Sequence, residues 1–479
     1  MSDRQFYSVS ASSDCIVDVA RYGMIDSTII EGMLKMKLAF VIGVFALLPM
    51  GYSICAPKPN IVFVFTDDQG YSDVSMYGQT DVRTPNIDRI ATEGVRFSRM
   101  RSNCTVCSPS RAAVLTGCFP DRVGVPGVIR TQPEHSFGYL KPDAVLLPAE
   151  LKKAGYHTAI VGKWHLGLQS PNLPNDRGFD EFHGFLGDMM DSYTTHQRDG
   201  QNYMRNNKEV ISPVGHATDL FTQWACRYIS ERATNKQPFF LYLAYNAPHA
   251  PIQPPADYLA RVKERNPAMK PKRAGIVALI EHLDDGIGKV LAILDELNLS
   301  KDTLVIFGTD NGGAVEHGSN NAPWRGGKQD HYDGGLCVPF AMRYPVMIKA
   351  GTTSVYPGQN FDIFPTCLEL AGVPLPAGID AQSLVPVLKG GTMPVSSREL
   401  YAVRREGNMK YCGKSYEALV CDGWKLMQND PFSPFELYNL NEDPGETNNC
   451  FKTEKVRANA MGKRLQWHIQ RGGSTPWQK

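Results

Sequence analysis

Four apolar runs along the chain each end in polar residues that can bind ions or move protons. The runs cover residues 60–66, 156–162, 238–245 and 303–309. An unbroken apolar run is typical of a strand that is covered on both faces, as in a parallel sheet. Taken alone, Asp67-Asp68 at the end of the first run is more simply a solvated turn. Parallel strands, however, bring their carboxyl ends to one edge of a sheet, so four such endings favour a shared site.

Helical patterns alternate with these runs. Apolar residues recur every three or four positions from 275 to 298, and shorter helices are expected at 85–92 and 144–154. This alternation predicts an α/β fold in which a large, mostly parallel sheet lies between helices. We interpret His282, Asp284 and Asp285, which fall on the long helix, as solvated or capping groups.

The sequence changes in character after residue 372. Proline and glycine are frequent from 374 to 394, which is typical of a boundary or a connecting loop. Short strand-like segments follow at 399–405, 418–421, 424–428 and 436–439, and a helix is expected at 453–471. We therefore divide the chain into a large N-terminal domain at 57–395 and a small α+β domain with an antiparallel sheet at 396–479.

Residues 1–56 are expected to be a leader. A short apolar run follows Met36 and ends in small residues, which is the pattern of a secretory signal peptide, and Met36 is a candidate for the true start. The run is short for a membrane span, so no stable span is expected. Export would permit disulfides. The 11 cysteines are scattered, and Cys412 and Cys421, beside an expected hairpin, are one candidate pair.

The composition is that of a globular protein. Hydrophobic residues make up 42% of the 479 residues, and the formal net charge is +1. A nearly neutral chain is unsuited to general binding of nucleic acid or of an acidic membrane surface. Recognition of an anion must therefore be local.

Residues 103–117, NCTVCSPSRAAVLTG, are the clearest candidate for local anion binding. Pro109 suits a first helical turn. Cys107 should therefore lie at a helix N-terminus, beside unpaired N–H groups, and Arg111 adds a positive charge one turn further on. A buried cysteine before an ordinary helix is the alternative. Cys104 completes a CxxC, which alone is a weak sign of redox or zinc chemistry.

The motif CSPSR at 107–111, followed by AAVLTG, resembles the signature of the sulfatase family. The resemblance extends over most of residues 57–450 through four further motifs: GKWHLG at 162–167, NAPHAP at 246–251, TDNGG at 309–313 and ELYNLNEDPGETNN at 436–449. It implies an alkaline phosphatase-like fold and the hydrolysis of sulfate esters. It also implies that a maturation enzyme oxidises Cys107 to formylglycine, whose hydrated aldehyde is the nucleophile.

Four residues match the family's calcium ligands: Asp67, Asp68, Asp310 and Asn311. They offer only oxygen donors, which favour calcium or magnesium over zinc. An oxygen of modified Cys107 and one of the substrate would raise the number of ligands to one that suits calcium. We therefore expect one calcium ion, which would polarise the sulfuryl group.

The resemblance assigns sulfate binding and proton transfer to five residues: Arg111, Lys163, His165, His249 and Lys328. Fixed cations would balance the charge that develops as the S–O bond breaks. Asp310 would help to activate the nucleophile, and His249 with Lys328 would protonate the departing alcohol oxygen. His165 would then remove the proton that lets sulfate leave. Strand periodicity predicts that Lys163 and His165 share a face.

The expected substrate is a sulfated polysaccharide or oligosaccharide. Two loops rich in aromatic and polar residues should frame it: Asp191, Tyr193, His196 and Arg198 in one, and His317, Asn320, Asn321, Trp324 and Arg325 in the other. The alternative is that these residues only cover surface loops. Asp191 or Ser192 also matches, loosely, a further sulfate contact of the family. Leu336-Cys337 stands where the family commonly has arginine before Val-Pro, which leaves that loop's contacts open.

Two other functions stay open. One is a phosphate or phosphonate monoester hydrolase on the same fold, although the zinc-binding histidine pattern of such phosphatases is missing from the sequence. The other is a secreted, calcium-dependent glycan-binding protein, which would require Cys107 to stay unmodified.

Overall fold

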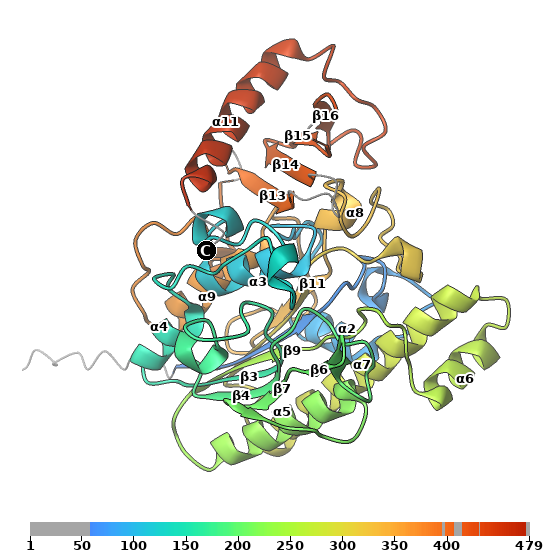
Figure 1. Ribbon diagram of the computed structural model, residues 1–479, viewed down its shortest axis with the longest axis vertical. Helices are drawn as coiled ribbons and strands as arrows, with labels where there is room; N and C mark the ends of the chain where they lie inside the picture. Colours follow the sequence, from blue (N-terminus) through green and yellow to red (C-terminus); the bar gives the residue numbers. More distant parts are fainter. Residues whose placement is uncertain (1–57, 395–397, 407–413, 431, 476–479) are drawn as a thin grey trace, which may run out of the picture. The chain divides into compact units, whose positions relative to one another are not determined.

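The computed structural model describes residues 58–394, 398–406, 414–430 and 432–475. The leader and Cys412, and with it the predicted cysteine pair, lie outside these ranges. A ten-stranded sheet forms the centre of the fold, in the order β12-β2-β11-β10-β1-β9-β3-β4-β7-β8 (Figure 1). Its middle strands are those predicted from the apolar runs: β10 (Thr303–Thr309), β1 (Asn60–Thr66), β9 (Phe239–Ala244) and β3 (His157–Lys163).

These four strands run parallel, as predicted, and so does β4 (Glu181–Phe185) beside β3. The flanking strands are short, and most pair antiparallel: β2 (Val95–Phe97), β7 (Met204–Asn206), β8 (Glu209–Val210), β11 (Phe340–Arg343) and β12 (Thr352–Ser354). A separate ribbon consists of β5 (Gln197–Arg198) and β6 (Gln201–Asn202). The predicted large, mostly parallel sheet is confirmed.

Helices cover both faces of this sheet. Alternate side chains of β1 point to opposite faces and pack into a separate hydrophobic core on each. Ile61, Phe63 and Phe65 pack with helices on one face: α3 (Cys107–Thr116), α4 (Leu147–Lys153) and α9 (Ile363–Leu370). Val62 and Val64 pack with helices on the other: α2 (Pro85–Thr92), α5 (Ala217–Ala233) and α7 (Pro271–Glu296). Leu388 of α10 (Val385–Leu388) also belongs to the first core, whereas α6 (Ala256–Arg265) and α8 (Asp333–Leu336) contribute to other cores. The α/β sandwich is confirmed, with the predicted helices found as α2, α4 and α7.

The side chains of His282 and Asp284 on α7 are buried, so neither group is solvated, whereas the alternative that Asp284 is a capping group is confirmed. Asp284 accepts hydrogen bonds from the N–H groups of Asn86 (3.1 Å) and Ile87 (2.8 Å) at the start of α2. It therefore caps a neighbouring helix. Nε2 of His282 lies 3.0 Å from Oδ1 of Asp219 on α5. Packing against α2 and α5 buries these two side chains. The hydrophobic periodicity of a single helix cannot reveal such contacts with other helices.

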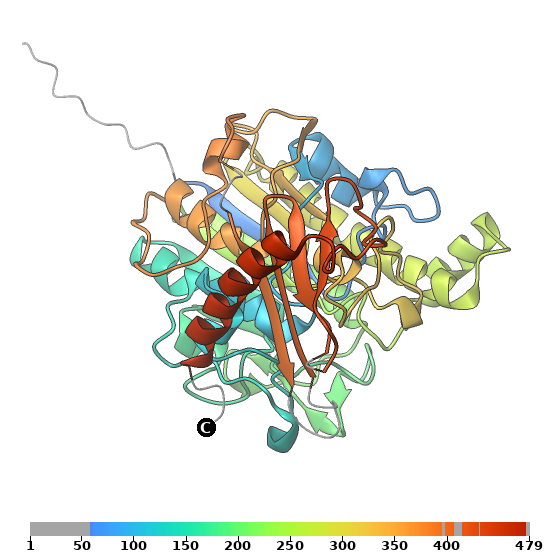
Figure 2. The ribbon, with the colours of Figure 1, turned by 90° about the horizontal axis from the view of Figure 1, so that it is seen from above.

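A four-stranded antiparallel sheet and a long helix form the C-terminal part, as predicted (Figures 1 and 2). Its elements are β13 (Leu400–Glu406), β14 (Lys414–Cys421), β15 (Trp424–Gln428), β16 (Glu436–Asn439) and α11 (Lys455–Gly473). Figure 2 shows α11 lying across this sheet. Tyr401 and Leu419 share a hydrophobic core with Ala113 of α3 and with Phe361. This shared core ties the small sheet to the helix that begins at Cys107, and the domain boundary at 395 stays a prediction.

Candidate active site

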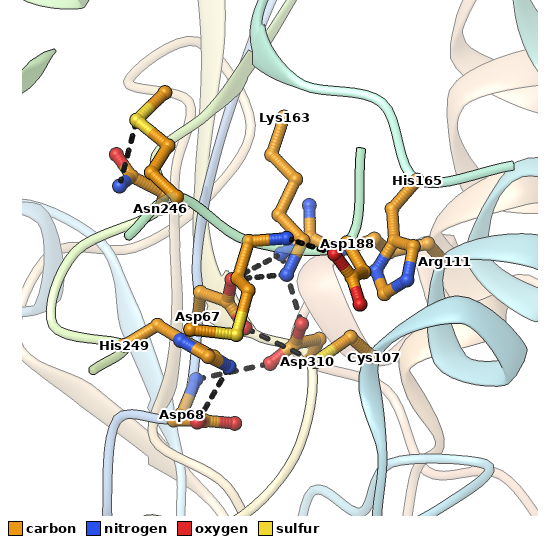
Figure 3. Close-up of polar contacts among 12 residues, drawn as sticks. Asp67, Asp68, Cys107, Arg111, Lys163, His165, Asp188, Asn246, His249 and Asp310 are labelled. Carbon is orange, nitrogen blue, oxygen red and sulfur yellow. Dashed lines mark hydrogen bonds and ion pairs between the residues drawn. The ribbon is translucent and has the colours of Figure 1, made fainter. Parts of the chain in front are cut away.

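The carboxyl ends of four parallel strands meet at one edge of the large sheet. Thr66 lies opposite Thr309 in the pairing of β1 with β10, and Gly162 lies opposite Ala244 in the pairing of β3 with β9. The polar residues that follow these strands therefore come together, as predicted. Figure 3 shows their side chains around a common centre, together with Cys107.

Cys107 is the first residue of α3, as predicted, and only 4% of its surface is exposed. Its Sγ lies 3.3 Å from Oδ1 of Asp67. Burial, and then the charge of Asp67, raise the pKa of the Cys107 thiol well above its ordinary value. Unmodified Cys107 is therefore protonated and a weak nucleophile. Burial also raises the pKa of Cys104 to about 12, so the CxxC lacks the acidic thiol of a redox pair.

Three carboxylates and one amide form a buried set of oxygen donors: Asp67, Asp68, Asp310 and Asn311. The Asp68 N–H donates to Oδ1 of Asp310 (3.1 Å), and Nδ2 of Asn311 donates to Oδ1 of Asp68 (2.8 Å). The side-chain oxygen of Asn311 has no hydrogen-bond partner among the described residues. A buried acceptor left free beside carboxylates fits a hard cation, which prefers oxygen donors.

Each carboxylate pairs with a different cation. The ion pairs are Lys163 Nζ with Asp67 Oδ2 (2.5 Å), Arg111 Nη2 with Asp310 Oδ2 (2.8 Å) and Lys328 Nζ with Asp68 Oδ2 (2.6 Å). Nε and Nη1 of Arg111 are buried and have no hydrogen-bond partner within the described part of the chain. Donors that the protein itself leaves unused are available to an anionic ligand.

Asp67 and Asp310 have opposite pKa shifts. Although burial opposes ionisation of Asp67, the nearby Lys163, with Arg111 and Lys328, holds its pKa well below the ordinary value. Burial and the charge of Asp67 raise the pKa of Asp310 to about 7, despite Arg111. One carboxylate stays ionised while its neighbour titrates near neutrality. Such a separation is common where a site transfers protons.

The imidazole of His249 faces Lys328. Nδ1 of His249 lies 2.7 Å from the carbonyl oxygen of Ala250 and must carry the hydrogen, because a carbonyl can only accept. Nε2 lies 3.1 Å from Nζ of Lys328 and 3.5 Å from Oδ2 of Asp68. Burial and then Lys328 lower the pKa of His249, so its ring is neutral and accepts a hydrogen bond from the lysine. The pair can pass a proton through Nε2.

His165 reaches the site by a turn and not by strand periodicity, so the basis of that prediction is wrong. β3 ends at Lys163, and His165 has a left-handed φ of 59°. Its N–H donates to the carbonyl of Leu186 (3.3 Å), and its Nε2 donates to the carbonyl of Ile129 (2.8 Å). Nδ1 is buried without a partner among the residues described. Burial, then Lys163 and Arg111, lower the pKa of His165 well below its ordinary value, so Nδ1 holds a lone pair.

Tyr193 does not line the site, and its predicted substrate contact is contradicted. Its side chain is fully buried, and its hydroxyl donates to the carbonyls of His249 (2.8 Å) and Asn246 (3.1 Å). Tyr193 therefore supports the loop that carries His249. His196 of the same loop is also buried and bonds the carbonyl of Gly215 (3.0 Å).

The other predicted substrate contacts lie at the surface. Oδ1 of the exposed Asp191 accepts from Nη1 of Arg198 (2.9 Å), and Oγ of Ser192 lies 3.1 Å from Oγ1 of Thr194. The Arg325 guanidinium donates to the carbonyl of Glu446 (2.7 Å) and lies 3.9 Å from the ring centre of Tyr332. These local partners orient the side chains, and contact with substrate stays a prediction for Asp191, Ser192 and Arg325.

Some residues near the site were not predicted from the sequence. β4 ends beside β3, and Leu186 just after it binds the backbone of His165. Figure 3 places Asp188 and Asn246 near the charged residues, and Asp188 pairs with Nε of Arg198 (3.1 Å). The segment EFHGF at 181–185 is short and only partly apolar, so it gave a weak strand signal.

Buried carboxylates, paired cations and neutral histidines at the carboxyl edge of a parallel sheet suit the hydrolysis of an anionic ester. Residues 59–373 match the Sulfatase family, and residues 327–471 match the family described as N-sulphoglucosamine sulphohydrolase, C-terminal. The chain therefore belongs to the sulfatase family and is a sulfatase.

Two relatives show how far the similarity extends. N-acetylgalactosamine-6-sulfatase of Mus musculus is 35% identical over 455 residues, which cover 86% of this chain and 85% of that protein. Steryl-sulfatase of Homo sapiens is 29% identical over 504 residues, which cover 88% and 82%.

Solved structures share the fold. The chain is similar to Ps i-CgsB in complex with k-i-k-neocarrahexaose, with a TM-score of 0.80, 30% identity and coverage of 87% of this chain and 93% of that one. It is also similar to a protein in complex with its substrate D-glucosamine-2-N,6-O-disulfate, with a TM-score of 0.69, 25% identity and coverage of 87% and 99%.

Proposed function

We propose that this sulfatase removes sulfate from a sulfated polysaccharide or oligosaccharide. A relative named for N-acetylgalactosamine 6-sulfate and two structural neighbours with bound sugars support this substrate class. The observation that carries the chemistry is the position of Cys107. Cys107 is the first residue of α3. Its Sγ lies 3.3 Å from Oδ1 of Asp67, within a group of three carboxylates and three cations.

The proposed nucleophile is formylglycine, made from Cys107 by a maturation enzyme. The raised pKa of the thiol supports this, because an unmodified Cys107 would be protonated and unreactive. The hydrated aldehyde would supply two hydroxyls on one carbon, so that one attacks sulfur and loss of the proton from the other expels sulfate, which a serine or threonine hydroxyl cannot do.

The proposed metal is calcium, held by Asp67, Asp68, Asp310 and Asn311. The free side-chain oxygen of Asn311 supports this assignment. Donor atoms of Asp67, Asp68, Cys107 and His249 also lie within 4.8 Å of one another. When bound, the ion would polarise a sulfuryl oxygen and favour the ionised form of the nucleophile.

The side chains around this group divide the remaining work. Arg111, Lys163 and Lys328 would bind the sulfate oxygens, and Arg111 has two unused nitrogens to do so. Lys328 would supply a proton that passes through Nε2 of His249 to the departing alcohol oxygen. Nδ1 of His165 would accept the proton whose loss allows sulfate to leave.

We also propose that the chain is exported after its leader is removed, because residues 36–56 have the pattern of a signal peptide. In the part that the structure describes, every helix is too short or too polar to cross a membrane. Export would bring the enzyme to the polymers that we propose as substrates.

A panel of defined sulfated oligosaccharides, matched to the same sugars as phosphate esters, tests this function. We expect sulfate release from at least one sugar and little phosphate release from any. The opposite preference would indicate a phosphate or phosphonate hydrolase, and binding without release would indicate a glycan-binding protein. An aryl sulfate in the panel reports the hydrolysis of a sulfate ester without any contact to a sugar. Turnover of the aryl sulfate with every sugar left intact would contradict the carbohydrate substrate.

A further inference from the structure

The backbone of Ile129 connects the start of α3 to His165. The Ile129 N–H donates to Oγ of Ser108 (3.0 Å), and the Ile129 carbonyl accepts from Nε2 of His165 (2.8 Å). Ser108 directly follows Cys107, and all four residues are buried. A single residue therefore links the helix that presents position 107 to the histidine proposed to act on it.

The segment around Ile129 is held on both sides. The Val128 N–H donates to Oε1 of Glu406 (3.4 Å), and its carbonyl accepts from the Phe137 N–H (2.9 Å). The Arg130 guanidinium pairs with Oε2 of the same Glu406 (3.1 Å). The segment is therefore a fixed support, and Ile129 itself is aligned by Ser108 and His165.

His165 needs such a support. Its left-handed φ of 59° is strained for a residue other than glycine, so the surrounding contacts must maintain it. The bond from Nε2 to Ile129 places the ring hydrogen on that nitrogen and fixes the plane of the ring. Nδ1, which has no partner in the described structure, is left as the basic atom.

We propose that Ser108 is a positioning residue for proton transfer, which acts on His165 through the backbone of Ile129. This inference rests on the proposed function, because it assumes that His165 acts as a base. Without Oγ of Ser108, the Ile129 N–H would be buried and unpaired. The backbone could relieve that cost only by turning, which would move the carbonyl that holds the ring of His165.

Ser110 provides a matched control. It lies in the same helical turn and motif, and it is as fully buried as Ser108. Its hydroxyl donates to the carbonyl of Cys104 (3.0 Å) and not to the Ile129 segment. Ser110→Ala therefore removes a similar hydroxyl without disturbing the support of His165.

A double-mutant cycle tests the proposal with an aryl sulfate as substrate. The variants are Ser108→Ala, His165→Ala and the two together, with Ser110→Ala, alone and combined with His165→Ala, as control. Rates are expressed per mole of converted enzyme, measured by peptide mass spectrometry, because both serines lie in the maturation motif. We expect Ser108→Ala to lower kcat roughly tenfold. We expect kcat/KM to fall less, since His165 would act after the alcohol has left.

In the His165→Ala background, Ser108→Ala should lower kcat by less than about twofold, because the group that it positions is gone. Ser108→Thr, which keeps the hydroxyl, should recover most of the rate. Ser108→Cys, with a weaker acceptor, should fall in between and serves if the alanine variant does not accumulate.

Equal losses from Ser108→Ala in both backgrounds would overturn the proposal, as would the same coupling to His165 from Ser110→Ala. Failure of the proposed function would differ, because the wild-type enzyme would then release no sulfate from aryl or sugar esters.

Discussion

Two clusters of buried charge in this protein use their carboxylates differently. One is the candidate active site, and the other, which we call the junction cluster, consists of Arg101, Asp333, Lys425 and Glu446. In the junction cluster, Arg101 donates to both oxygens of Asp333 (3.1 and 2.5 Å). Lys425 lies 3.0 Å from Asp333 and 2.8 Å from Glu446, and the Asp333 N–H donates to Glu446 (2.6 Å). These contacts join α8 to the C-terminal sheet.

The pKa shifts alone do not separate the two clusters, because each holds one carboxylate with a lowered pKa and one whose pKa is raised by burial. Although burial opposes ionisation of Asp333, Arg101 and Lys425 hold its pKa well below the ordinary value. At Asp310, burial and the charge of Asp67 prevail and raise the pKa to about 7. Nη2 of Arg111 lies 3.7 Å from Asp67 as well as 2.8 Å from Asp310, and Lys425 likewise contacts both Asp333 and Glu446.

Buried polar atoms without partners distinguish the candidate active site from the junction cluster. The active site keeps buried atoms without partners in the described structure, on Asn311, Arg111 and His165, whereas both carboxylate oxygens of Asp333 are bonded. A cluster whose donors are all used has none left for a ligand. A cluster with unused donors and acceptors could be completed by a bound ion or substrate. We infer that unused polar atoms, and not the pKa shifts, separate functional from structural charge here.

The largest effect is expected when the reactive position itself is removed. Cys107→Ala should lower turnover of an aryl sulfate by roughly ten-thousandfold or more, since the nucleophile is lost. Thermal unfolding should hardly change, because the thiol contributes one buried contact to Asp67. Kinetics and calorimetry on the same preparation check both expectations. An active Cys107→Ala enzyme would rule out the proposed nucleophile.

The junction cluster should respond in the opposite way. Asp333→Asn leaves Arg101 and Lys425 buried without their shared counter-charge, and we expect a loss of about 3–5 kcal/mol in the free energy of unfolding. Turnover per folded molecule should stay close to wild type at low temperature. Urea denaturation and active-site-normalised rates measure the two quantities. A stable but inactive variant would break the comparison.

Asp310→Asn is the matched change within the active site. It should lower kcat at least roughly a hundredfold, because a proposed metal ligand and an electrostatic contributor are lost together. Its free energy of unfolding should fall less than that of Asp333→Asn, since burial already disfavours the charged form of Asp310. Calcium titration by calorimetry, compared with wild type, checks the ligand role. Finding zinc in active wild-type enzyme, or full activity after chelation, would argue against calcium.

The central strands could be predicted because each is buried on both faces and its sequence shows this directly. It could also be predicted that the residues after those strands lie close together, since parallel strands end at one edge of a sheet. Cys107 at the helix start followed from Pro109 two positions later. These parts depend on local sequence or on strand direction alone.

Other parts could not be predicted because they depend on the path of loops. The partner of His165 is a carbonyl 36 positions away, and Arg101 and Asp333 are separated by 232 positions. Tyr193 lies in a polar loop that resembles a binding loop in sequence, yet the fold turns its ring inward. Contacts of this kind arise from the tertiary structure and have no periodic signal.

The smallest effect is expected at Asp284, whose carboxylate accepts hydrogen bonds but forms no ion pair with a cation of the described residues. It therefore tests whether a buried structural carboxylate needs a counter-charge. Its oxygens accept from Asn86 and Ile87, yet burial raises its pKa to about 7, from 3.8. Because the folded state binds this proton more tightly, the stabilisation is full below about pH 4 and lost as the pH rises toward 7. Asp284→Asn should therefore be less stable than wild type at about pH 5 and similar at about pH 8, as urea denaturation would show. A difference that is the same at both pH values would mean that hydrogen bonds alone suffice for a structural carboxylate. The role of Asp333 would then depend on how fully its oxygens are hydrogen-bonded and not on the positive charges beside it.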